Sequence, residues 1–542
     1  MNANRTNTIL SLSACLASAL VAAAPASAQW SHNPAANSGL VVGGSDQNQA
    51  KSLPTADGGW YLVWLDGIGT GWDTRLQRYD SHGVAQWASS VLVADTAFSS
   101  TQDYGFAVDA AGNAIIAYRD DGNVGGSPVQ IKVQKIDAAG NLLWSTGTQV
   151  SATAGGSAPH CCATSDGGAV VGWTTSGGAA AMQKVDSSGA PQWTAGGIID
   201  TQPAGIYFVS DVVADNAGGA IGLYHHQTGG FTSPRYLKMQ RFDSASGAKL
   251  WNSATPVAIF EGTGNSVVSG FFPYLVSDGS GGAMVAWYNG STASTRNAYL
   301  QHVDANGVEV FPHNGITIAD DVTGRMRIWA TLTLDASTGD IYMIAKEGNI
   351  SPQGSYSLRV QKFDAAGARQ WGNLGVEVLS QGATQPSFAW AQALASGQGA
   401  MFVWDNGGFN AQQVFATRLN TDGTAAWTPS TLTISSVLSG KARLWISANA
   451  ARDRALITWA DNRTAGTNDI YGACVSLNGS SGNPGDVDDN GSVDVNDLLG
   501  VITTWGACPA PPTLCPADIA PAPLGDGQVD VNDLLATITN WG

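Results

Sequence analysis

Glutamate, net positive charge and long apolar runs are all scarce in this 542-residue chain. Glu fills only 4 of the 42 acidic positions, so nearly all of the acidity comes from Asp. Asp hydrogen-bonds its own backbone in turns whereas Glu favours helices, and with 67 Gly this bias predicts many tight turns and little helix. We therefore expect the body of the chain to be all-β.

The charge balance excludes two classes of partner. The formal net charge is −17, and a chain this acidic repels phosphate backbones and anionic lipid surfaces. We therefore expect no nucleic-acid partner. Beyond the first residues, no segment reaches the roughly eighteen consecutive apolar residues that a membrane span requires, so we expect no membrane span either.

The first residues have the composition of an export signal. Arg5 precedes the apolar stretch Ile9–Ala24, and the small residues Ala26–Ala28 follow it as a cleavage site. A lipoprotein box ending at Cys15 is the alternative, but the apolar run before Cys15 is short. We predict that residues 1–28 are removed and that the mature chain is secreted, either extracellular or associated with the cell surface.

Residues 29–480 repeat one pattern every 49 to 60 residues. A strand ending in Gln leads to an Asp-x-x-Gly turn, and a large aromatic residue follows the turn. Each unit also carries a Gly-rich hairpin that leads into an apolar strand. Periods near 50 with four short strands are typical of β-propeller blades. The seven aromatic residues that follow a turn are Trp87, Trp144, Trp193, Trp251, Phe311, Trp371 and Trp427.

Counting the units predicts how the ring closes. The hairpin strand occurs eight times, but only seven turns with their aromatic residue follow, because the unit at 455–479 ends early. Trp30 stands alone at the other end of the repeat region. We predict that a strand near 37–44 completes the last blade together with strands from 444–478. The expected fold is one eight-bladed β-propeller, with seven blades as the fallback.

Two short motifs in the last unit resemble a known group of proteins. Trp459-Ala-Asp-Asn-Arg463 and Asn468-Asp-Ile-Tyr471 are similar to the W-x-D-x-R and N-D-I-Y motifs of bacterial extracellular repeat proteins. The resemblance covers most of residues 30–480. It implies an architecture and no activity.

The end of the chain contains a calcium-binding loop. Such loops place oxygen ligands at positions 1, 3, 5, 7, 9 and 12 and Gly at position 6. Gly491 occupies the turn, and an Asp closes the loop where an EF-hand has Glu. The expected calcium ligands are Asp486, Asp488, Asn490, the Ser492 carbonyl, Asp494 and Asp497.

The loop and its helix are duplicated. Residues 493–506 and 529–542 match at 11 of 14 positions, and this duplication resembles the type I dockerin domain. The resemblance implies a small helical, calcium-dependent domain at 486–542, joined to the propeller by a linker at 481–485. It also implies a cohesin-like or surface protein as the partner.

The second loop departs from the pattern. Its candidate ligands are Asp518, Asp526, Gln528, Asp530 and Asp533, but Ala and Leu stand at loop positions 1 and 3 when counted back from Asp533. A second calcium site requires four extra loop residues, so that Asp518 supplies the first oxygen.

Five cysteines remain after export, an odd number for an oxidising compartment. Cys508 and Cys515 close a short Pro-rich loop, as in some bacterial dockerin-like tails, and are the expected disulfide. Cys161 and Cys162 are adjacent and form either a vicinal disulfide or a pair of small buried thiols. Cys474 has no evident partner.

An enzymatic role has two candidates. Eight-bladed quinoprotein alcohol dehydrogenases carry a disulfide between adjacent cysteines and Trp-docking motifs similar to Phe242–Trp251, but the channel ligands for calcium are not evident. Glycoside hydrolysis needs two suitably placed carboxylates, and nearly every Asp lies in a repeat turn. His225 and His226 are expected in an exposed loop. We therefore expect a non-catalytic binding or structural propeller with glycans as ligands, and a quinoprotein dehydrogenase or glycoside hydrolase as the alternative.

Overall fold

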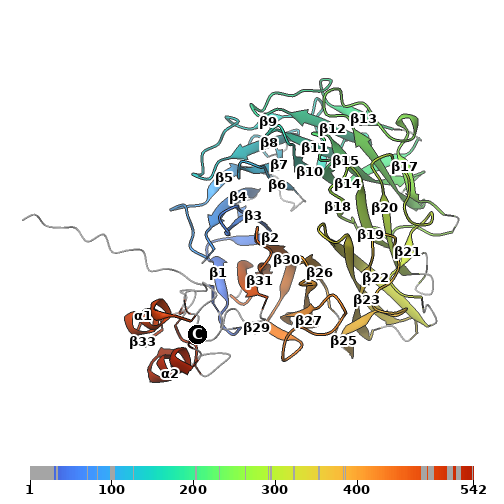
Figure 1. Cartoon of the computed structure of the whole chain (residues 1–542). Coiled ribbons are helices and arrows are strands. Elements are labelled where there is room, and N and C mark those ends of the chain that lie inside the picture. The colour runs from blue at the N-terminus through green and yellow to red at the C-terminus, as the bar shows by residue number, and fades with distance from the viewer. Residues whose placement is uncertain are drawn as a thin grey trace, which may run out of the picture.

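The structure is a computed structural model in which eight four-stranded antiparallel sheets form a ring, each sheet making one blade (Figure 1). The first strand of each of blades 1 to 7, and β30 of blade 8, lies nearest the ring centre. The structure describes residues 30–541 except 32–33, 70, 82, 98–103, 126, 202–203, 231, 263, 291, 293–295, 321–323, 352–353, 383, 385, 465, 478–484, 486, 488–492, 509–514, 516, 521–526 and 540.

The strands follow chain order from the centre outward in blades 1 to 7. Blades 1 to 4 comprise β2 (Asp46–Pro54), β3 (Trp60–Ile68), β4 (Gly71–Tyr79), β5 (Val91–Ala94); β6 (Gly105–Val108), β7 (Ala114–Asp120), β8 (Gln130–Ile136), β9 (Thr148–Gln149); β10 (Ser157–Ala163), β11 (Ala169–Thr174), β12 (Ala180–Val185), β13 (Ile198–Asp200); and β14 (Ile206–Ala214), β15 (Ala220–Gln227), β16 (Arg235–Phe242), β17 (Val257–Phe260). A single 3₁₀ turn among the described residues, η1, spans Asn252–Ala254.

Blade 8 differs because its outermost strand comes from the beginning of the chain. Blades 5 to 8 comprise β18 (Leu275–Ser277), β19 (Ala283–Asn289), β20 (Asn297–Val303), β21 (Ile316–Thr317); β22 (Arg325–Asp335), β23 (Asp340–Asn349), β24 (Tyr356–Phe363), β25 (Val376–Gly382); β26 (Ala389–Ala393), β27 (Ala400–Gly408), β28 (Ala411–Leu419), β29 (Leu432–Ser439); and β30 (Lys441–Ala448), β31 (Arg454–Asp461), β32 (Asp469–Ser476), β1 (Ser38–Val41).

The repeated turn and its aromatic residue form the contact between neighbouring blades. In blade 2 the Gln134 side chain accepts a hydrogen bond from the Trp144 backbone N–H at 3.0 Å and so fixes the position of the indole. The Trp144 indole N–H then donates to the Ser187 carbonyl in the turn of blade 3 at 3.1 Å. Gly189 of that turn packs against the Trp144 indole. Its φ is 86°, and a Cβ there would come within 2.7 Å of the indole. The repeat motif is therefore an inter-blade joint.

The same indole-to-turn hydrogen bond recurs around the ring. Phe311 fills the position in blade 5 without an N–H to donate. The other pairs are Trp30–Ser81, Trp87–Ala138, Trp193–Ser244, Trp251–Ala305, Trp371–Thr421 and Trp427–Leu477.

The N-terminal segment closes the ring, as the sequence predicted. β1 pairs antiparallel with β32, with Gly39 opposite Tyr471. Trp30 is fully buried and donates from its indole to the Ser81 carbonyl of blade 1 at 2.9 Å. Trp30 therefore supplies the eighth joint, and the eight-bladed count is confirmed.

The W-x-D-x-R motif holds this closure. The Trp459 indole donates to the Asp461 carboxylate at 2.9 Å, and Arg463 bonds the same carboxylate at 2.6 Å. The Arg463 guanidinium stacks on the Tyr471 ring at 3.7 Å and donates to the Ala36 carbonyl at 2.7 Å. The motif thus ties blade 8 to the N-terminal segment.

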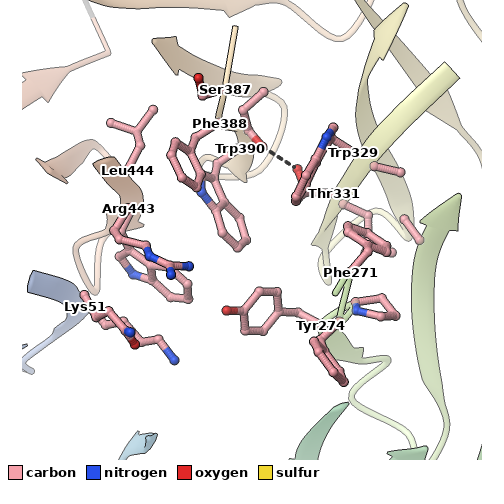
Figure 2. Close-up of a pocket in the computed structure, with 18 of the residues that line it drawn as sticks. Lys51, Phe271, Tyr274, Trp329, Thr331, Ser387, Phe388, Trp390, Arg443 and Leu444 are labelled. Atoms are coloured by element: carbon pink, nitrogen blue, oxygen red, sulfur yellow. Dashed lines mark hydrogen bonds between the residues drawn. The ribbon is translucent and has the colours of Figure 1, made fainter. Parts of the chain in front are cut away.

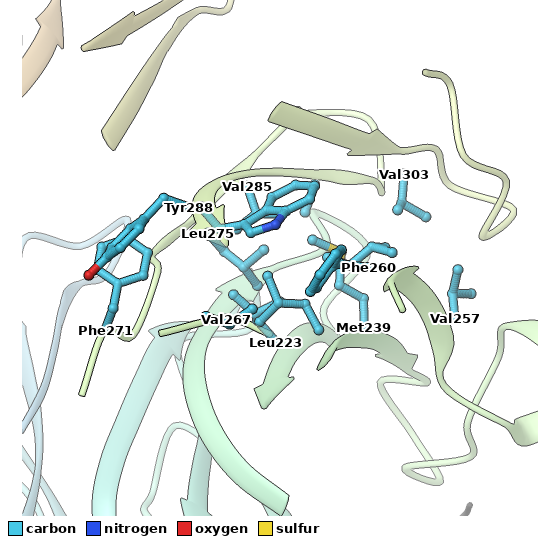
Figure 3. Packing of buried hydrophobic residues seen from close by; sticks show 14 of the residues in the cluster. Leu223, Met239, Val257, Phe260, Val267, Phe271, Leu275, Val285, Tyr288 and Val303 are labelled. Atoms are coloured by element: carbon cyan, nitrogen blue, oxygen red, sulfur yellow. The ribbon is translucent and has the colours of Figure 1, made fainter. Parts of the chain in front are cut away.

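The apolar core lies between adjacent blades. Leu223 and Met239 of blade 4 share one cluster with Val285 and Trp287 of blade 5, and Figure 3 shows several residues of this cluster. Both faces of the second strand in a blade are covered by neighbouring sheets, and for this reason strands such as β15 and β23 are buried along nearly their whole length.

A small second unit follows the propeller. α1 (Val495–Thr503) and α2 (Val531–Thr539) lie outside the ring in Figure 1, and β33 (Gly506–Ala507) pairs with β34 (Gln528–Val529). A small cluster that includes Val501 packs between them. None of the helices in the described part of the chain is both long and apolar enough to span a membrane.

Replacing Trp30 tests the closing joint. We expect Trp30→Ala to destabilise the whole propeller by about 3–5 kcal/mol, because a fully buried indole is lost. Trp30→Phe keeps an aromatic ring, as Phe311 does naturally, and loses the hydrogen bond and part of the indole volume, so it should cost less, about 1–2 kcal/mol. Thermal unfolding measures both variants. A Trp30→Ala protein that melts like the wild type would contradict the closure.

Candidate binding pocket

A cavity of about 300 Å³ lies at the centre of the ring. Its walls come from β2, β22, β26 and β30, the inner strands of blades 1, 6, 7 and 8, and from the segment that precedes β18 (Figure 2). Its aromatic lining residues are Phe271, Phe272, Tyr274, Trp329, Phe388, Trp390 and Trp445.

Aromatic rings form two facing walls of this pocket. Tyr274, Trp390 and Trp445 are mutual neighbours, with ring centroids 5.3 Å, 5.9 Å and 4.9 Å apart. On the other side Phe271 meets Trp329 edge to face at 5.6 Å. The rings hold one another in tilted and edge-on arrangements that aromatic pairs favour, so the walls are preformed.

β-bulges in the inner strands direct side chains into the pocket. The pairing register shifts at Gln49 in β2, Trp329 in β22 and Arg443 in β30. All three residues have left-handed backbone, with φ of 55°, 54° and 53°. This conformation costs a residue with a Cβ about 1–2 kcal/mol. The inner strand β10 has the same shift with left-handed Ala158 outside the pocket, so the bulge belongs to the inner strands and the side chains it carries distinguish the site. Trp329 is also 40% exposed, which is unusual for so large an apolar side chain.

The two charged residues of the lining are both basic. The Lys51 ammonium lies 4.9 Å from the Tyr104 ring centroid and 5.7 Å from those of Tyr274 and Trp445, and it donates to the Tyr104 carbonyl at 3.2 Å. Arg443 is exposed and projects from the same side of the pocket as Lys51 (Figure 2). The described residues that line the cavity include no Asp, Glu or His.

A buried carboxyl group holds one edge of the pocket in place. The side chain of Asp405, in β27, accepts hydrogen bonds from the backbone N–H groups of Ser387 and Phe388 at 3.0 Å and 2.6 Å. Burial raises the pKa of Asp405 to about 6. Thr331 of β22 donates to the Ala389 carbonyl of β26 at 3.1 Å, which joins two walls of the pocket (Figure 2).

The prediction of a disulfide between Cys161 and Cys162 is wrong, and the alternative prediction of two buried thiols is confirmed. Cys161 and Cys162 are free and buried, and burial raises the pKa of Cys161 to about 12. Adjacent residues of a strand project to opposite faces, so Cys161 packs between blades 2 and 3 and Cys162 between blades 3 and 4. Neither residue lines the cavity. The Phe242–Trp251 segment forms an ordinary blade joint through Trp251.

The expectation for the paired histidines is also wrong. His225 and His226 lie inside β15 and are almost fully buried. The strand continues three residues past its apolar stretch because neighbouring sheets cover both of its faces. Burial lowers the pKa of His225 to about 3. His160 lies 3.4 Å from the Asp211 carboxylate, and neither residue lines the pocket.

In the tail, the same two hydrogen bonds form at the start of α1 and at the start of α2. Before α1, Asp494 accepts from the Asn496 N–H and Asp497 accepts from the Asp494 N–H, both at 2.7 Å. Before α2, Asp530 and Asp533 repeat these two bonds at the same distance. The predicted ligands Asp486, Asp488, Asn490, Ser492 and Asp526 lie outside the described residues.

The described residues on either side of the second loop bond to one another. Asp518 accepts from the N–H of Gly527, the position-6 glycine, at 2.9 Å. Asp533 is fully buried and also accepts from the N–H groups of Ile519 and Ala520. Gln528 lies in β34 between them in the chain. Asp518 and Asp533 therefore border one loop, and their oxygens suit a hard cation.

The disulfide between Cys508 and Cys515 is confirmed, with Cα atoms 5.6 Å apart. Both cysteines pack against the small apolar cluster of the tail. Their sulfurs also lie near the Asp518 carboxylate, but two bonded sulfurs are not thiolate ligands for a metal.

The pocket aromatics carry a signal that sequence reasoning missed. Most Trp residues of the propeller occupy either the blade joint or the apolar hairpin strand. Trp329, Trp390 and Trp445 occupy neither place, and all three line the cavity. Trp72 in β4 also lies outside these places and does not line the cavity, so the sequence mark of this site is a Trp in the first strand of a repeat unit.

Comparison with known proteins identifies distant structural similarity alone. No protein family and no curated protein matches the chain. The chain is similar to a protein of unknown function from Dyadobacter fermentans (TM-score 0.37, 9% identity, 79% of this chain and 94% of that chain). It is also similar to prolyl oligopeptidase B from Galerina marginata (0.42, 10%, 78% and 56%) and to the polysaccharide lyase Uly1 (0.39, 8%, 80% and 90%). At these TM-scores none of the three bears on the activity of this chain.

The left-handed backbone at Trp329 predicts that a Gly variant is more stable than an Ala variant there, the reverse of the order in an ordinary strand. Trp329→Gly should be more stable than Trp329→Ala by about 1 kcal/mol, since only Gly adopts the left-handed backbone without cost. Trp390 has no such backbone, so Trp390→Ala should be more stable than Trp390→Gly. Melting temperatures of the four variants check the prediction, and the same order at both sites would contradict it.

Asp405 predicts a pH-dependent effect on stability. Its folded pKa of about 6 lies above the ordinary value of 3.8, so the folded chain keeps a proton that the unfolded chain releases in this range. The contribution of Asp405 to stability therefore falls as pH rises from 4 to 6, by about 2–3 kcal/mol. Asp405→Asn does not titrate, and its melting temperature relative to wild type should be higher at pH 8 than at pH 4. An equal difference at both pH values would argue against a buried titrating carboxyl.

Proposed function

We propose that the protein is an exported, non-catalytic propeller that binds a carbohydrate in its central pocket. Its tail attaches it, in a calcium-dependent way, to a cohesin-like partner or a cell surface. The observation that carries the first part is the meeting of Tyr274, Trp390 and Trp445 around one cavity, opposite Trp329.

A sugar ring suits this pocket on three counts. One face of a pyranose presents C–H groups, which pack on aromatic faces. Its hydroxyl rim needs polar partners, and Gln49, Thr331, Ser387 and Arg443 stand among the lining residues. A volume of about 300 Å³ lies at the lower end of small-molecule sites, enough for one or two rings.

The lining favours binding over catalysis. A glycoside hydrolase of the common kind uses two carboxyl groups about 5–10 Å apart, and no carboxylate belongs to the described lining. A quinoprotein mechanism has lost its main support, because Cys161 and Cys162 are separate thiols in the blade core. Binding is the function that needs only the groups present.

The surface of the tail supports partner binding. α1 and the residues after it expose an apolar stripe, and α2 repeats it at the same spacing and nearly the same exposure, about half of each side chain. Duplicated apolar stripes that face solvent are typical of protein interaction sites. The two stripes are Val495, Leu499, Ile502 and Trp505, and Val531, Leu535, Ile538 and Trp541.

Calcium should bind the tail through carboxylates. The residues suited to hold it are Asp494 and Asp497 with their predicted partners in the first loop, and the ion would join the loop to the start of α1. We expect calorimetry on the full chain to detect at least one calcium site. Asp497→Asn should weaken that site at least about tenfold, because position 12 supplies a charged ligand.

The control for the calcium experiment is Asp137→Asn, which removes the same charge from a blade turn. Because the tail contains no Lys or Arg, chymotrypsin is the protease that reports its folding. Calcium should protect the tail from cleavage in the wild type and in the control. Equal calcium binding by Asp497→Asn would refute the assignment.

Carbohydrate binding should depend on the pocket aromatics. Against a panel of plant, algal and bacterial oligosaccharides, we expect at least one to bind the full chain, and Trp390→Ala to weaken it at least tenfold, the loss typical of a central aromatic contact. Phe409→Ala is the control, since Phe409 is 93% exposed and lies outside the pocket. No binding by any saccharide, or alcohol oxidation after loading with pyrroloquinoline quinone and calcium, would overturn the proposal.

A further inference from the structure

The charge in the pocket is opposite in sign to the charge of the chain. The protein has 42 acidic and 25 basic residues, yet the charged groups of the pocket lining are Lys51 and Arg443. A pocket lined at random from this chain would more often hold carboxylates. The local excess of positive charge therefore distinguishes the site from the rest of the molecule.

Arg443 is placed for a ligand. Other arginines of the propeller bond carboxylates of the chain, as Arg241 does with Asp215 and Arg327 with Glu347. No carboxylate among the described residues bonds Arg443, which stays exposed at the pocket wall. Its left-handed backbone, φ 53°, holds it in the bulge of β30 at a conformational cost.

Lys51 argues against a cationic ligand in this pocket. Three aromatic rings around a cavity suit a quaternary ammonium group. Here the Lys51 ammonium already lies within 6 Å of the ring centroids of Tyr104, Tyr274 and Trp445. A cationic ligand would meet both this ammonium and the Arg443 guanidinium. An anion at the same place would be attracted by both groups.

We infer that the pocket takes an acidic saccharide, whose anionic group binds Arg443 beside Lys51 while its ring packs on Trp390 and Trp445. This rests on the proposed carbohydrate-binding function and adds the charge of the ligand. The Arg443 guanidinium offers parallel N–H donors that match a carboxylate or a sulfate ester. Tyr274 points its hydroxyl toward the basic side in Figure 2, so the polar end of the ligand faces that side.

The test compares sugars that share a backbone and differ in whether they carry anionic groups. The probes are trimers of galacturonate, mannuronate and guluronate, each with its fully methyl-esterified form, and sulfated and unsulfated galactan trimers. Calorimetry measures their affinity for the full chain. We expect at least one acidic trimer to bind at least about tenfold more tightly than its neutral partner. Added salt should reduce this ratio of affinities. Whether a uronate or a sulfated trimer shows this preference identifies the anionic group.

Arg443→Gln should abolish the preference for the acidic form, because it weakens binding of the acidic trimer much more than binding of its neutral partner. The matched control is Arg452→Gln, which removes the same charge from another residue with left-handed backbone, φ 56°, outside the pocket. Equal affinity of the wild type for acidic and neutral forms would overturn the inference while the carbohydrate site stands. Equal loss of both forms in Arg443→Gln would also overturn it. No binding of either form, together with no binding across the wider panel, would overturn the site itself.

Discussion

The architecture depends on one contact, the aromatic ring that each blade places beneath the turn of the next. Among the described residues, seven of the eight aromatic rings carry a turn glycine on their face, and seven donate an indole hydrogen bond to the turn. Because these joints connect each blade only with its two neighbours, stability accumulates joint by joint around the ring. The glutamine, the turn aspartate and the glycine of the repeat all serve to position this ring.

Since these joints use the outer strands and turns, they leave the inner strands free to differ. The inner strands of blades 1, 6 and 8 carry the bulges at Gln49, Trp329 and Arg443, and β26 of blade 7 adds Trp390. The pocket is thus formed by the parts of each blade that the repeat does not specify. The repeated motif forms the joints between blades, and residues outside that motif line the pocket.

The limits of sequence-based prediction follow the same division. The repeat motif, the number of hairpin strands and the solitary Trp30 were sufficient to predict eight blades and the closing strand, because each is a local pattern. Trp329 and Trp445 lie more than a hundred residues apart in the chain, so their meeting depends on ring geometry. The bulges depend on strand register, which no local pattern specifies. His225 was misplaced because burial on both faces of β15 overrides its polarity.

The position of β32 has a mechanical consequence. It lies between β31 and β1, bonded to a ladder on each side, and it is the propeller strand from which the chain continues toward the tail. A force applied through the tail therefore reaches β32 first and strains both ladders at once. It also acts on the blade whose Arg463 holds the N-terminal segment. A propeller tethered by this tail would begin to yield at the joint where its two ends meet.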